Sequence, residues 1–363
     1  MLRGCLIGKK PEYGIMHCLS KVALTFLSPS ILFCAWIILF IDSSWVQASD
    51  KKSEKVFVVI PKFTHAFFER TKRGCIFAAK SLEGVSCRYE PPRSFDVREQ
   101  VRILEDMLSI GVDGIAIAPI SSAAIGRALR QSNTKKVPIV TFDSDLRAED
   151  RYLRYTYIGS NNFSIGVELA RMLNEIRPEG GLLLIQAGEP PAENLKERLE
   201  GFLSHLENFD LDVNSVHSRK WKQVPGSPMY CDASEQIAVR QLEDTLGAYP
   251  ELSAFVALGA WPQVAKRGYK QALKNQKMRI DSNQLVLLAA DTLDMQIELL
   301  AEGYTQGLVG QRPFEMGAKS IRVLYKIINK EVADIPDPIY TGLDICTSDN
   351  LSSCINEGDM ASK

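Results

Sequence analysis

The chain has none of the short motifs that commit a sequence to catalysis, although it runs to 363 residues. A G-x-S-x-G elbow, a P-loop, a G-x-G-x-x-G turn after a strand and an H-E-x-x-H helix are all missing, which removes the usual grounds for hydrolase, nucleotide-binding or metallopeptidase activity. Only four histidines occur, and His65, His205 and His217 are too scattered to suggest a metal cluster or a catalytic triad. We therefore expect a protein that is not an enzyme and needs no cofactor. A carbohydrate-acting enzyme built on carboxylates alone is the alternative.

An excess of charge of one sign is also missing. Lysine and arginine total 43 and aspartate and glutamate total 44, which gives a net charge of −1. Nucleic-acid binding usually needs a basic surface, so this balance argues against it and against electrostatic attachment to anionic lipid. The hydrophobic content of 45% is ordinary for a globular protein, and the length is enough for two domains that each bury a core.

No cysteine pair has C-x-x-C spacing, so the sequence does not support a metal site or a redox motif built from cysteines. Three of the eight cysteines fall near the N-terminus, and the others are Cys75, Cys87, Cys231, Cys346 and Cys354. An exported chain could form disulfides, and Cys346 with Cys354 is the best-placed pair, followed by Cys75 with Cys87. The odd count leaves at least one thiol free, which we expect to be buried and inert.

The N-terminal region has the pattern of a secretory signal. Lys21 precedes an apolar segment, Val22 to Ile41, and small residues up to Ala48 come before a charged stretch. We expect residues 1–48 to be a signal peptide cleaved after Ala48, and the protein to be periplasmic or otherwise exported. A start of translation at Met16 is an alternative to Met1. An uncleaved anchor helix is the alternative, because the apolar run is nearly long enough to span a bilayer.

Beyond residue 54, short apolar runs alternate with helical stretches of 12 to 18 residues. The expected strands are 56–60, 85–90, 114–118, 138–142, 155–160, 181–186, 211–216, 254–258, 285–290 and 307–311. The expected helices are 67–82, 97–109, 123–132, a helix that ends at 173, 192–206, 233–246, 262–274, 294–302 and 313–329. Strands separated by helices of this length form right-handed crossover units, which predicts an α/β fold with doubly wound parallel sheets.

Single polar and aromatic residues follow the C-terminal ends of several expected strands. They are His65, Phe67 and Phe68 after the first strand, Asp143, Asn161, Arg198 on the helix after 181–186, Trp261, Asp291 and Gln311. Strand ends of a parallel sheet share one edge, so these side chains can converge on one crevice. Carboxylates, amides and a guanidinium can bind hydroxyl groups, while aromatic rings cover the C–H faces of a sugar. Trp221 and Tyr230 are further candidates for a covering aromatic.

Seven segments in order resemble one family: HAFFERTKRG, GVDGIAIAP, VPIVTFDSD, YIGSNNFSIG, LKERLEGF, LLAADTLDM and GLVGQRPFEMGAKSI. From Lys55 to about Ile345 the chain looks like the periplasmic sugar-binding proteins of ABC transporters, in the ribose and galactose class. The resemblance implies that Phe67 and Phe68 stack on a sugar ring and that Asp143 and Asp291 bind its hydroxyls from opposite sides. Arg198 and Gln311 would complete the polar set.

The sequence departs from the family pattern at several site positions. His65 and Ala66 stand where the family has Asn and Pro, and Ser144 replaces an Arg that often follows the first Asp. Ala118 replaces an Asn, and Ala260, Trp261 and Pro262 replace an Asn-Asp pair. These changes put ribose itself in doubt and leave another pentose, a hexose, a deoxy sugar or a polyol open.

The family implies a type I periplasmic-binding-protein fold of two lobes joined by a three-crossing hinge. We expect residues 53–157 plus 312–335 in the first lobe, 158–311 plus 338–345 in the second, and a polar tail at 346–363. The expected protein is a monomer that captures a monosaccharide or polyol and delivers it to an ABC transporter permease. A receptor that presents the ligand to a sensor kinase or chemoreceptor is the alternative, and a DNA-binding regulator is disfavoured because the helix-turn-helix domain is absent.

Overall fold

The computed structural model describes residues 54–132, 137–189, 192–206 and 220–357. The expected signal peptide, its anchor-helix alternative and the expected strand 211–216 lie outside these residues. Within them, no helix is both long and apolar enough to cross a membrane.

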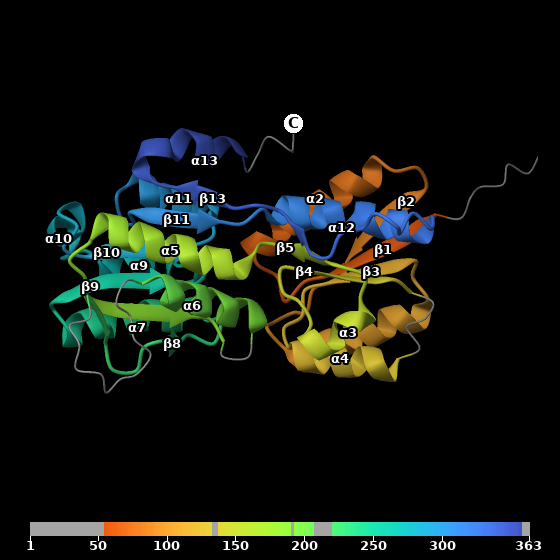
Figure 1. Ribbon diagram of the computed structural model, residues 1–363, viewed down its shortest axis with the longest axis horizontal. Helices are drawn as coiled ribbons and strands as arrows, with labels where there is room; N and C mark the ends of the chain where they lie inside the picture. The colour runs from red at the N-terminus through yellow and green to blue at the C-terminus, as the bar shows by residue number, and fades with distance from the viewer. Residues whose placement is uncertain (1–53, 133–136, 190–191, 207–219, 358–363) are drawn as a thin grey trace, which may run out of the picture. The chain divides into compact units, whose positions relative to one another are not determined.

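The first sheet is entirely parallel among the described strands. Its spatial order is β12 (Ile339–Tyr340), β5 (Tyr157–Gly159), β4 (Ile139–Phe142), β3 (Gly114–Ile117), β1 (Lys55–Ile60) and β2 (Val85–Tyr89). Its helical segments are α2 (Ala66–Lys80), α3 (Val97–Ile110), α4 (Ser122–Gln131), the 3₁₀ helix η3 (Ala148–Leu153) and α12 (Pro313–Ile328). Figure 1 shows α2 and α12 over one face of this sheet and α3 and α4 over the other.

Alternation along β1 explains this two-sided arrangement. Phe57 and Val59 pack with α2 and α12, whereas Val58 and Ile60 pack with α3 and α4, and all four are fully buried. A strand that is buried on both faces has a continuous apolar sequence, as β1 has.

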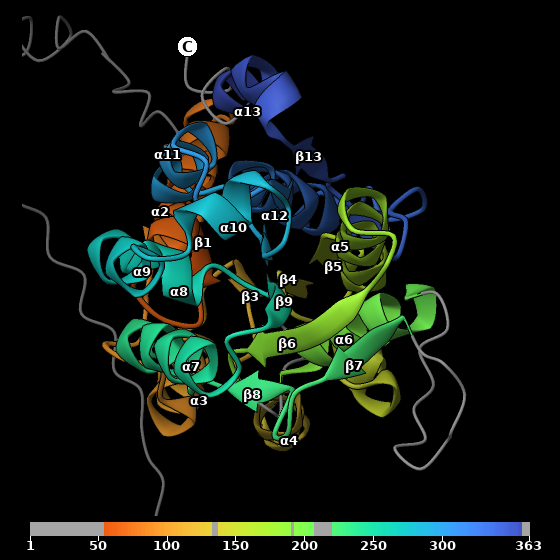
Figure 2. The ribbon, with the colours of Figure 1, turned by 90° about the vertical axis from the view of Figure 1, so that its left-hand side faces the viewer.

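The second sheet has the same spatial arrangement of strands, except that its edge strand, residues 344–346, is antiparallel to its neighbour. It runs β13 (Asp344–Cys346), β11 (Gly307–Gly310), β10 (Val286–Ala290), β9 (Leu252–Ala257), β6 (Gly181–Ala187) and β7 (Trp221–Gln223), while β8 (Met229–Tyr230) also pairs with β6. Its helical segments are α5 (Asn162–Ile176), α6 (Glu193–His205), α7 (Glu235–Ala248), α8 (Trp261–Val264), α9 (Lys266–Ala272), α10 (Lys277–Asp281), α11 (Asp294–Ala301), η4 (Ser348–Asn350) and α13 (Leu351–Glu357). In Figure 2, α5 and α6 lie on one side of β6 and β9, and α7 and α9 lie on the other. The expectation of doubly wound α/β sheets is confirmed.

Sheet membership moves two of the expected lobe boundaries. The chain passes between the sheets after β5, after β11 and between β12 and β13 in the described residues. Residues 158–159 and the strand β12 were expected in the second lobe, but β5 and β12 pair with each other in the first sheet. The physical reason is that β12 has only two residues, too few for hydropathy to indicate which sheet it joins. We call the two α/β units around these sheets the first and second lobe.

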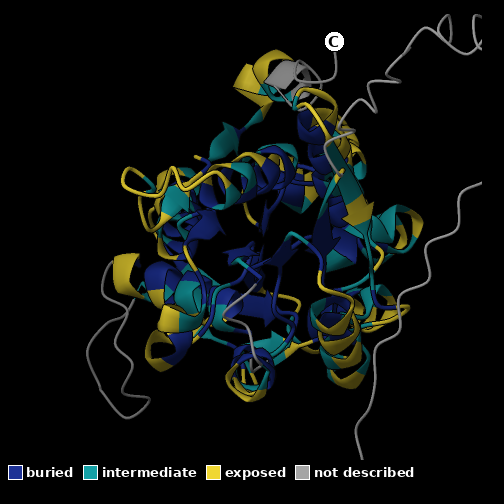
Figure 3. Ribbon diagram, turned by 90° about the vertical axis from the view of Figure 1, so that its right-hand side faces the viewer, coloured by how far each residue is buried: buried dark blue, intermediate teal, exposed yellow. Residues whose placement is uncertain are grey.

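Most of the expected helices form, with one interruption. The expected helix 262–274 divides into α8 and α9 at Ala265. The short elements β7, β8, α10 and α13 were not expected, whereas the expected last strand near 338–345 forms as β12 and β13. Figure 3 shows the central strands buried and the outer faces of the helices exposed. Edge strands such as β2 and β12 are partly exposed.

Both expected disulfides are present. Cys75 in α2 is bonded to Cys87 in β2, and Cys346 in β13 is bonded to Cys354 in α13. Cys231 is the free cysteine of the described residues, and it is fully buried. Burial raises the pKa of its thiol to about 12, which keeps it protonated and inert.

Candidate functional site

A cavity of about 70 Å³ lies where the strand ends of the two sheets meet. One water needs about 10–15 Å³ by the same measure, so the cavity holds roughly five to seven waters, or one small ligand. Eight of the nine residues proposed from the sequence line it, namely His65, Phe67, Phe68, Asp143, Arg198, Trp261, Asp291 and Gln311. Their convergence is a geometric finding, and their ligand roles remain a prediction.

Aromatic rings from the first lobe form one wall. Phe67 and Phe68 lie in the first turn of α2, are 6% and 4% exposed, and meet edge to face with ring centroids 5.1 Å apart. Phe63 contacts Phe68 and Phe95 with centroid separations of 6.0 and 5.5 Å. His65 precedes α2 in extended conformation and its Nδ1 accepts from the Phe67 N–H at 3.3 Å, which places both rings at the start of the helix.

Asp143 directly follows β4 and has a positive φ of 59°. Its Oδ2 lies 2.9 Å from the Nζ of Lys62, and both side chains are less than a tenth exposed. Lys62 also donates to the Oδ1 of Asn194 at 3.4 Å. Lys62 therefore neutralises Asp143. Because Asn194 belongs to α6, Lys62 also contacts the second lobe.

Asp291 directly follows β10 and also has a positive φ, which is 76°. Its Oδ1 accepts from the Nε2 of Gln311 at 2.7 Å. The Oε1 of Gln311 is buried and has no hydrogen-bond partner in the described part of the chain.

Arg198 is 2% exposed and projects from α6. Its Nε donates to the Oδ1 of Asn162 at 3.0 Å and its Nη1 to the Leu258 carbonyl at 2.8 Å. The remaining Nη2 is buried without a partner among the residues that the structure describes. Two of its three nitrogens are therefore fixed by the second lobe, and the third is available to a ligand.

His65 provides a further unpaired donor. Its Nδ1 accepts a backbone hydrogen bond, so the proton of the neutral ring is on Nε2, and this atom is buried without a partner within the described ranges. Burial lowers the pKa of His65, although Asp291 and Asp143 act in the opposite direction. The ring is therefore neutral near pH 7.

Trp261 begins α8, and its indole packs on the ends of two neighbouring strands. A Cβ on Gly188 would lie 2.4 Å from Cζ2 of the indole, and one on Gly259 would lie 2.3 Å from Cζ3. Neither position could carry a side chain unless the indole moved.

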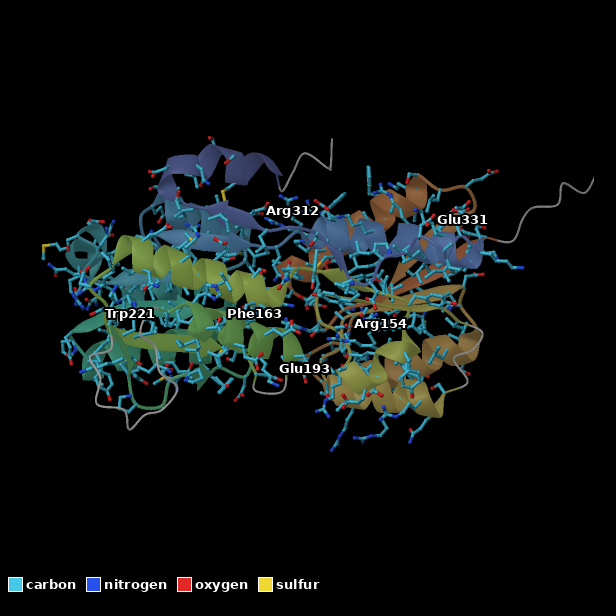
Figure 4. The ribbon with its side chains drawn as sticks, viewed as in Figure 1. Arg154, Phe163, Glu193, Trp221, Arg312 and Glu331 are labelled. Carbon is cyan, nitrogen blue, oxygen red and sulfur yellow. A yellow bond between two sulfur atoms is a disulfide. The ribbon has the colours of Figure 1, made fainter. Side chains whose placement is uncertain are left out.

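Asn161, the ninth proposed residue, does not line this cavity. Its Oδ1 accepts from the Ser164 N–H at 3.0 Å and caps α5, so the structure gives it a capping role. Trp221 and Tyr230 are also outside the cavity. Trp221 is fully buried in β7 and donates to Asn174, and Figure 4 shows it far from the region where the lobes meet.

The sequence reasoning missed several lining residues that obey the same strand-end rule. Lys62 and Phe63 follow β1, Phe95 follows β2 and Glu189 follows β6. Asn194 lies one helical turn before Arg198 on the same face of α6. These residues would have been found if every residue after a strand, and every residue in the first two turns of the following helix, had been considered as a candidate. No group of three or more His, Cys, Asp or Glu side chains suited to a metal occurs in the described residues.

Comparisons with known proteins agree with this architecture. Residues 56–331 match the model of a family described as periplasmic binding protein domain. The xylose/arabinose-binding protein XylF of Sulfolobus acidocaldarius is 22% identical over 317 residues, which cover 84% of this chain and 74% of that protein. The ribose import binding protein RbsB of Salmonella typhimurium is 22% identical and covers 82% of this chain and 92% of that protein.

Solved structures are also similar to this chain. An ABC transporter solute-binding protein of Burkholderia graminis, in complex with D-arabinose, is 27% identical with a TM-score of 0.71, covering 83% of this chain and 98% of that one. A solute-binding protein of Agrobacterium vitis with bound D-fucose is 21% identical with a TM-score of 0.73, covering 84% and 99%, and shows the likeness of fold.

Proposed function

Since the chain belongs to the periplasmic binding protein domain family, we propose that it is an exported solute-binding protein that captures a monosaccharide or related polyol. It delivers this ligand to the permease of an ABC transporter and acts as a monomer. Residues 1–48 direct its export. The relatives named above are sugar-binding proteins, and two solved structures of similar fold hold a sugar.

One observation carries the proposal: three residues that line one aromatic cavity each have a buried polar atom without a partner in the described chain. The atoms are the Nε2 of His65, the Nη2 of Arg198 and the Oε1 of Gln311. A buried polar atom without a hydrogen bond costs about 1–3 kcal/mol, so three such residues around one cavity indicate a ligand that satisfies them. Two are donors and one is an acceptor, which suits hydroxyl groups because a hydroxyl both donates and accepts.

Charge balance favours a neutral ligand. Lys62 is paired with Asp143, and the cationic Arg198 and the anionic Asp291 both line the cavity. Glu189, which also lines it, has a pKa raised by burial and by Asp232, with Lys62 acting in the opposite direction. A uronate would add an uncompensated negative charge to a buried site, which is costly.

Contacts between the lobes support capture by closure. The Oδ1 of Asn194, in the second lobe, accepts from Lys62 and from the Oγ of Ser144, both in the first lobe. At the rim, Arg70 of α2 pairs with Asp294 of α11 at 2.5 Å. A ligand bound between such surfaces contacts both lobes only when they are closed, so its affinity selects the closed form that a permease can recognise.

A sugar panel tests the proposal. The purified protein is titrated with neutral pentoses, hexoses and polyols by isothermal calorimetry, and tryptophan emission is followed because Trp261 lines the cavity. We expect at least one sugar to bind, to raise the melting temperature and to change the emission. If no member of the panel did so, and mass spectrometry found no small molecule released from the denatured protein, the proposal would be wrong.

A further inference from the structure

The side chain of Asn162 joins Arg198 to Tyr157. Asn162 is the first residue of α5 and is 3% exposed, and its Oδ1 accepts from the Nε of Arg198 at 3.0 Å. Its Nδ2 donates to the Oη of Tyr157 in β5 at 3.4 Å. This hydroxyl donates in turn to the backbone carbonyls of Asp143 and Ser160, each 3.1 Å away. A chain of buried hydrogen bonds therefore runs from Arg198 in the second lobe to Asp143 in the first.

The chemistry of the partners fixes the orientation of the Asn162 amide. A guanidinium only donates, so the Oδ1 of Asn162 must face Arg198. The Nδ2 donates to Tyr157 and also to Glu197 of α6, where burial raises the pKa of the carboxyl group and this hydrogen bond acts against the rise. Burial, with Asp143 acting in the same direction, raises the pKa of Tyr157 well above its ordinary value, so its hydroxyl stays protonated. Asn162 therefore has no hydrogen left for a ligand.

Close packing at two glycines brings these groups together. A Cβ on Gly166 of α5 would overlap the backbone carbonyl of Arg198, so α5 and α6 approach closely where Asn162 meets the guanidinium. A Cβ on Gly159 would likewise overlap the Oη of Tyr157. The side chain of Asn162 is not needed to start α5, because Asn161 supplies the cap, and neither Asn162 nor Tyr157 lines the cavity.

Building on the proposed function, in which Arg198 binds the ligand, we infer that Asn162 is a positioning residue that holds the Arg198 guanidinium in its binding orientation. Tyr157 holds the amide of Asn162 and, through the Asp143 carbonyl, links this orientation to the first lobe. Without Asn162, the guanidinium keeps only the bond to the Leu258 carbonyl among the described residues and is free to turn about it.

Calorimetric titration tests this inference. The wild type is titrated with D-ribose, D-xylose, L-arabinose, D-galactose and myo-inositol, and the tightest binder is then used for every variant. We expect Asn162→Ala to raise the Kd by about tenfold or more, the scale on which loss of a hydrogen bond to a charged group acts. Tyr157→Phe removes only a hydroxyl, should raise the Kd by about threefold to tenfold, and carries the comparison if the alanine variant does not fold.

A double-mutant cycle shows whether the effect passes through Arg198. Arg198→Lys keeps a positive charge but lacks the planar fork, so it should weaken binding without abolishing it. In this background, Asn162→Ala or Tyr157→Phe should change the Kd by less than about threefold, because the group that they position is already gone. In a crystal structure of the ligand-free Asn162→Ala protein, the Arg198 guanidinium should be displaced or occupy more than one orientation.

The matched control is Asn174→Ala, since Asn174 also lies on α5 and bonds to the His205 carbonyl and to Trp221, all outside the cavity lining. It should lower the free energy of unfolding and keep the wild-type Kd. A wild-type Kd in Asn162→Ala, an equal loss in Asn174→Ala, the same loss in both Arg198 backgrounds or an unmoved guanidinium would overturn the inference and leave the proposed function intact. A wild type that bound no sugar or polyol would overturn the proposed function and this inference with it.

Discussion

Asp143 and Asp291 occupy equivalent positions in the two lobes. Each directly follows a central strand, β4 or β10, and each has a positive φ, 59° and 76°. The N–H of Asp143 donates to the Ile158 carbonyl at 3.2 Å, and that of Asp291 to the Val309 carbonyl at 2.8 Å, in both cases on the neighbouring strand. Positive φ is unfavourable for most residues other than glycine, and aspartate is among those that tolerate it best. The same backbone device therefore presents a carboxylate to the cavity from each lobe.

Replacement of either carboxylate by its amide should weaken sugar binding. We expect Asp143→Asn and Asp291→Asn each to raise the Kd by about tenfold to a hundredfold, because a hydrogen bond to a charged group contributes about 1.5–3 kcal/mol. Isothermal calorimetry measures the change. Asp334→Asn, on an exposed segment, is the matched control and should bind like the wild type. Wild-type affinity in both site variants would remove the two acids from the ligand set.

The same two variants should differ in stability without ligand. Asp143→Asn leaves the 6% exposed Lys62 without its ionic partner, so we expect the free energy of unfolding to fall by about 3 kcal/mol or more. Asp291 is bonded to the neutral Gln311, so Asp291→Asn should cost about 1 kcal/mol. Urea denaturation measures both values. Equal losses would mean that the Lys62 pair does not stabilise the folded state.

His65 should make the stability of the ligand-free protein depend on pH. Its folded pKa is lowered by burial, so between that pKa and the ordinary value of about 6.5 the unfolded chain binds more protons than the folded one. The stability that His65 contributes is therefore complete above about pH 6.5 and is lost as the pH falls through the folded pKa.

The matched variant for this effect is His65→Asn, since asparagine can still cap α2 but does not titrate. Partly buried glutamates such as Glu189, with raised pKa values, act with the opposite sign, but they are common to both proteins. We expect the free energy of unfolding of the wild type, measured relative to His65→Asn, to decrease between pH 7 and pH 5. A constant difference across this range would show that His65 does not titrate differently on folding.

The cysteines should react in a defined pattern. With Cys75–Cys87 and Cys346–Cys354 bonded, Cys231 is the one thiol of the described residues, and its burial and raised pKa make it unreactive. The chain without residues 1–48 should therefore incorporate no maleimide when folded and one when unfolded without reductant, and five after reduction. Mass spectrometry counts the labels. More than one label in the unreduced, unfolded chain would mean that a disulfide is absent.

The sequence predicts the strand ends well because they are determined by the hydropathy of a few consecutive residues. Apolar runs such as residues 56–60 and 285–290 must be buried strands, and the residues after them must lie at the edge of a parallel sheet. That rule alone brought Asp143, Asp291 and Gln311 to one cavity. It failed for Asn161, which also follows a strand, because a residue at a strand end can equally well cap the next helix.

What the sequence could not predict depends on tertiary position. Nothing in the local sequence shows that the ammonium of Lys62 reaches Asp143, eighty-one positions later in the chain. The strand β12 has two residues and its sheet was assigned wrongly, since so short a strand is defined by its neighbour and not by its own hydropathy. Trp221 was a candidate for the site and is a core residue, because an aromatic in an irregular segment carries no signal of direction.

Asn194 should couple sugar binding to closure of the lobes more strongly than the Arg70–Asp294 ion pair at the rim does. Its Oδ1 accepts from two donors of the other lobe, Lys62 and Ser144, and all three side chains are nearly inaccessible to water. The Asp294 side chain, in contrast, is 88% exposed, and exposed ion pairs contribute at most about 1 kcal/mol. We therefore expect Asn194→Ala to raise the Kd by about tenfold or more and Asp294→Asn by less than about fivefold.

Because Asn194 lines the cavity, a second variant must separate closure from direct ligand contact. Ser144 is not among the cavity-lining residues, yet its hydroxyl donates to Asn194, so Ser144→Ala removes one bond between the lobes and leaves the ligand surface unchanged. It should raise the Kd about threefold to tenfold, since one such bond contributes about 0.5–1.5 kcal/mol. Small-angle scattering with saturating sugar should then show the same compact form as the wild type, reached at higher sugar concentration. A Ser144→Ala protein with wild-type affinity, beside a weakened Asn194→Ala, would assign Asn194 to ligand contact and not to closure.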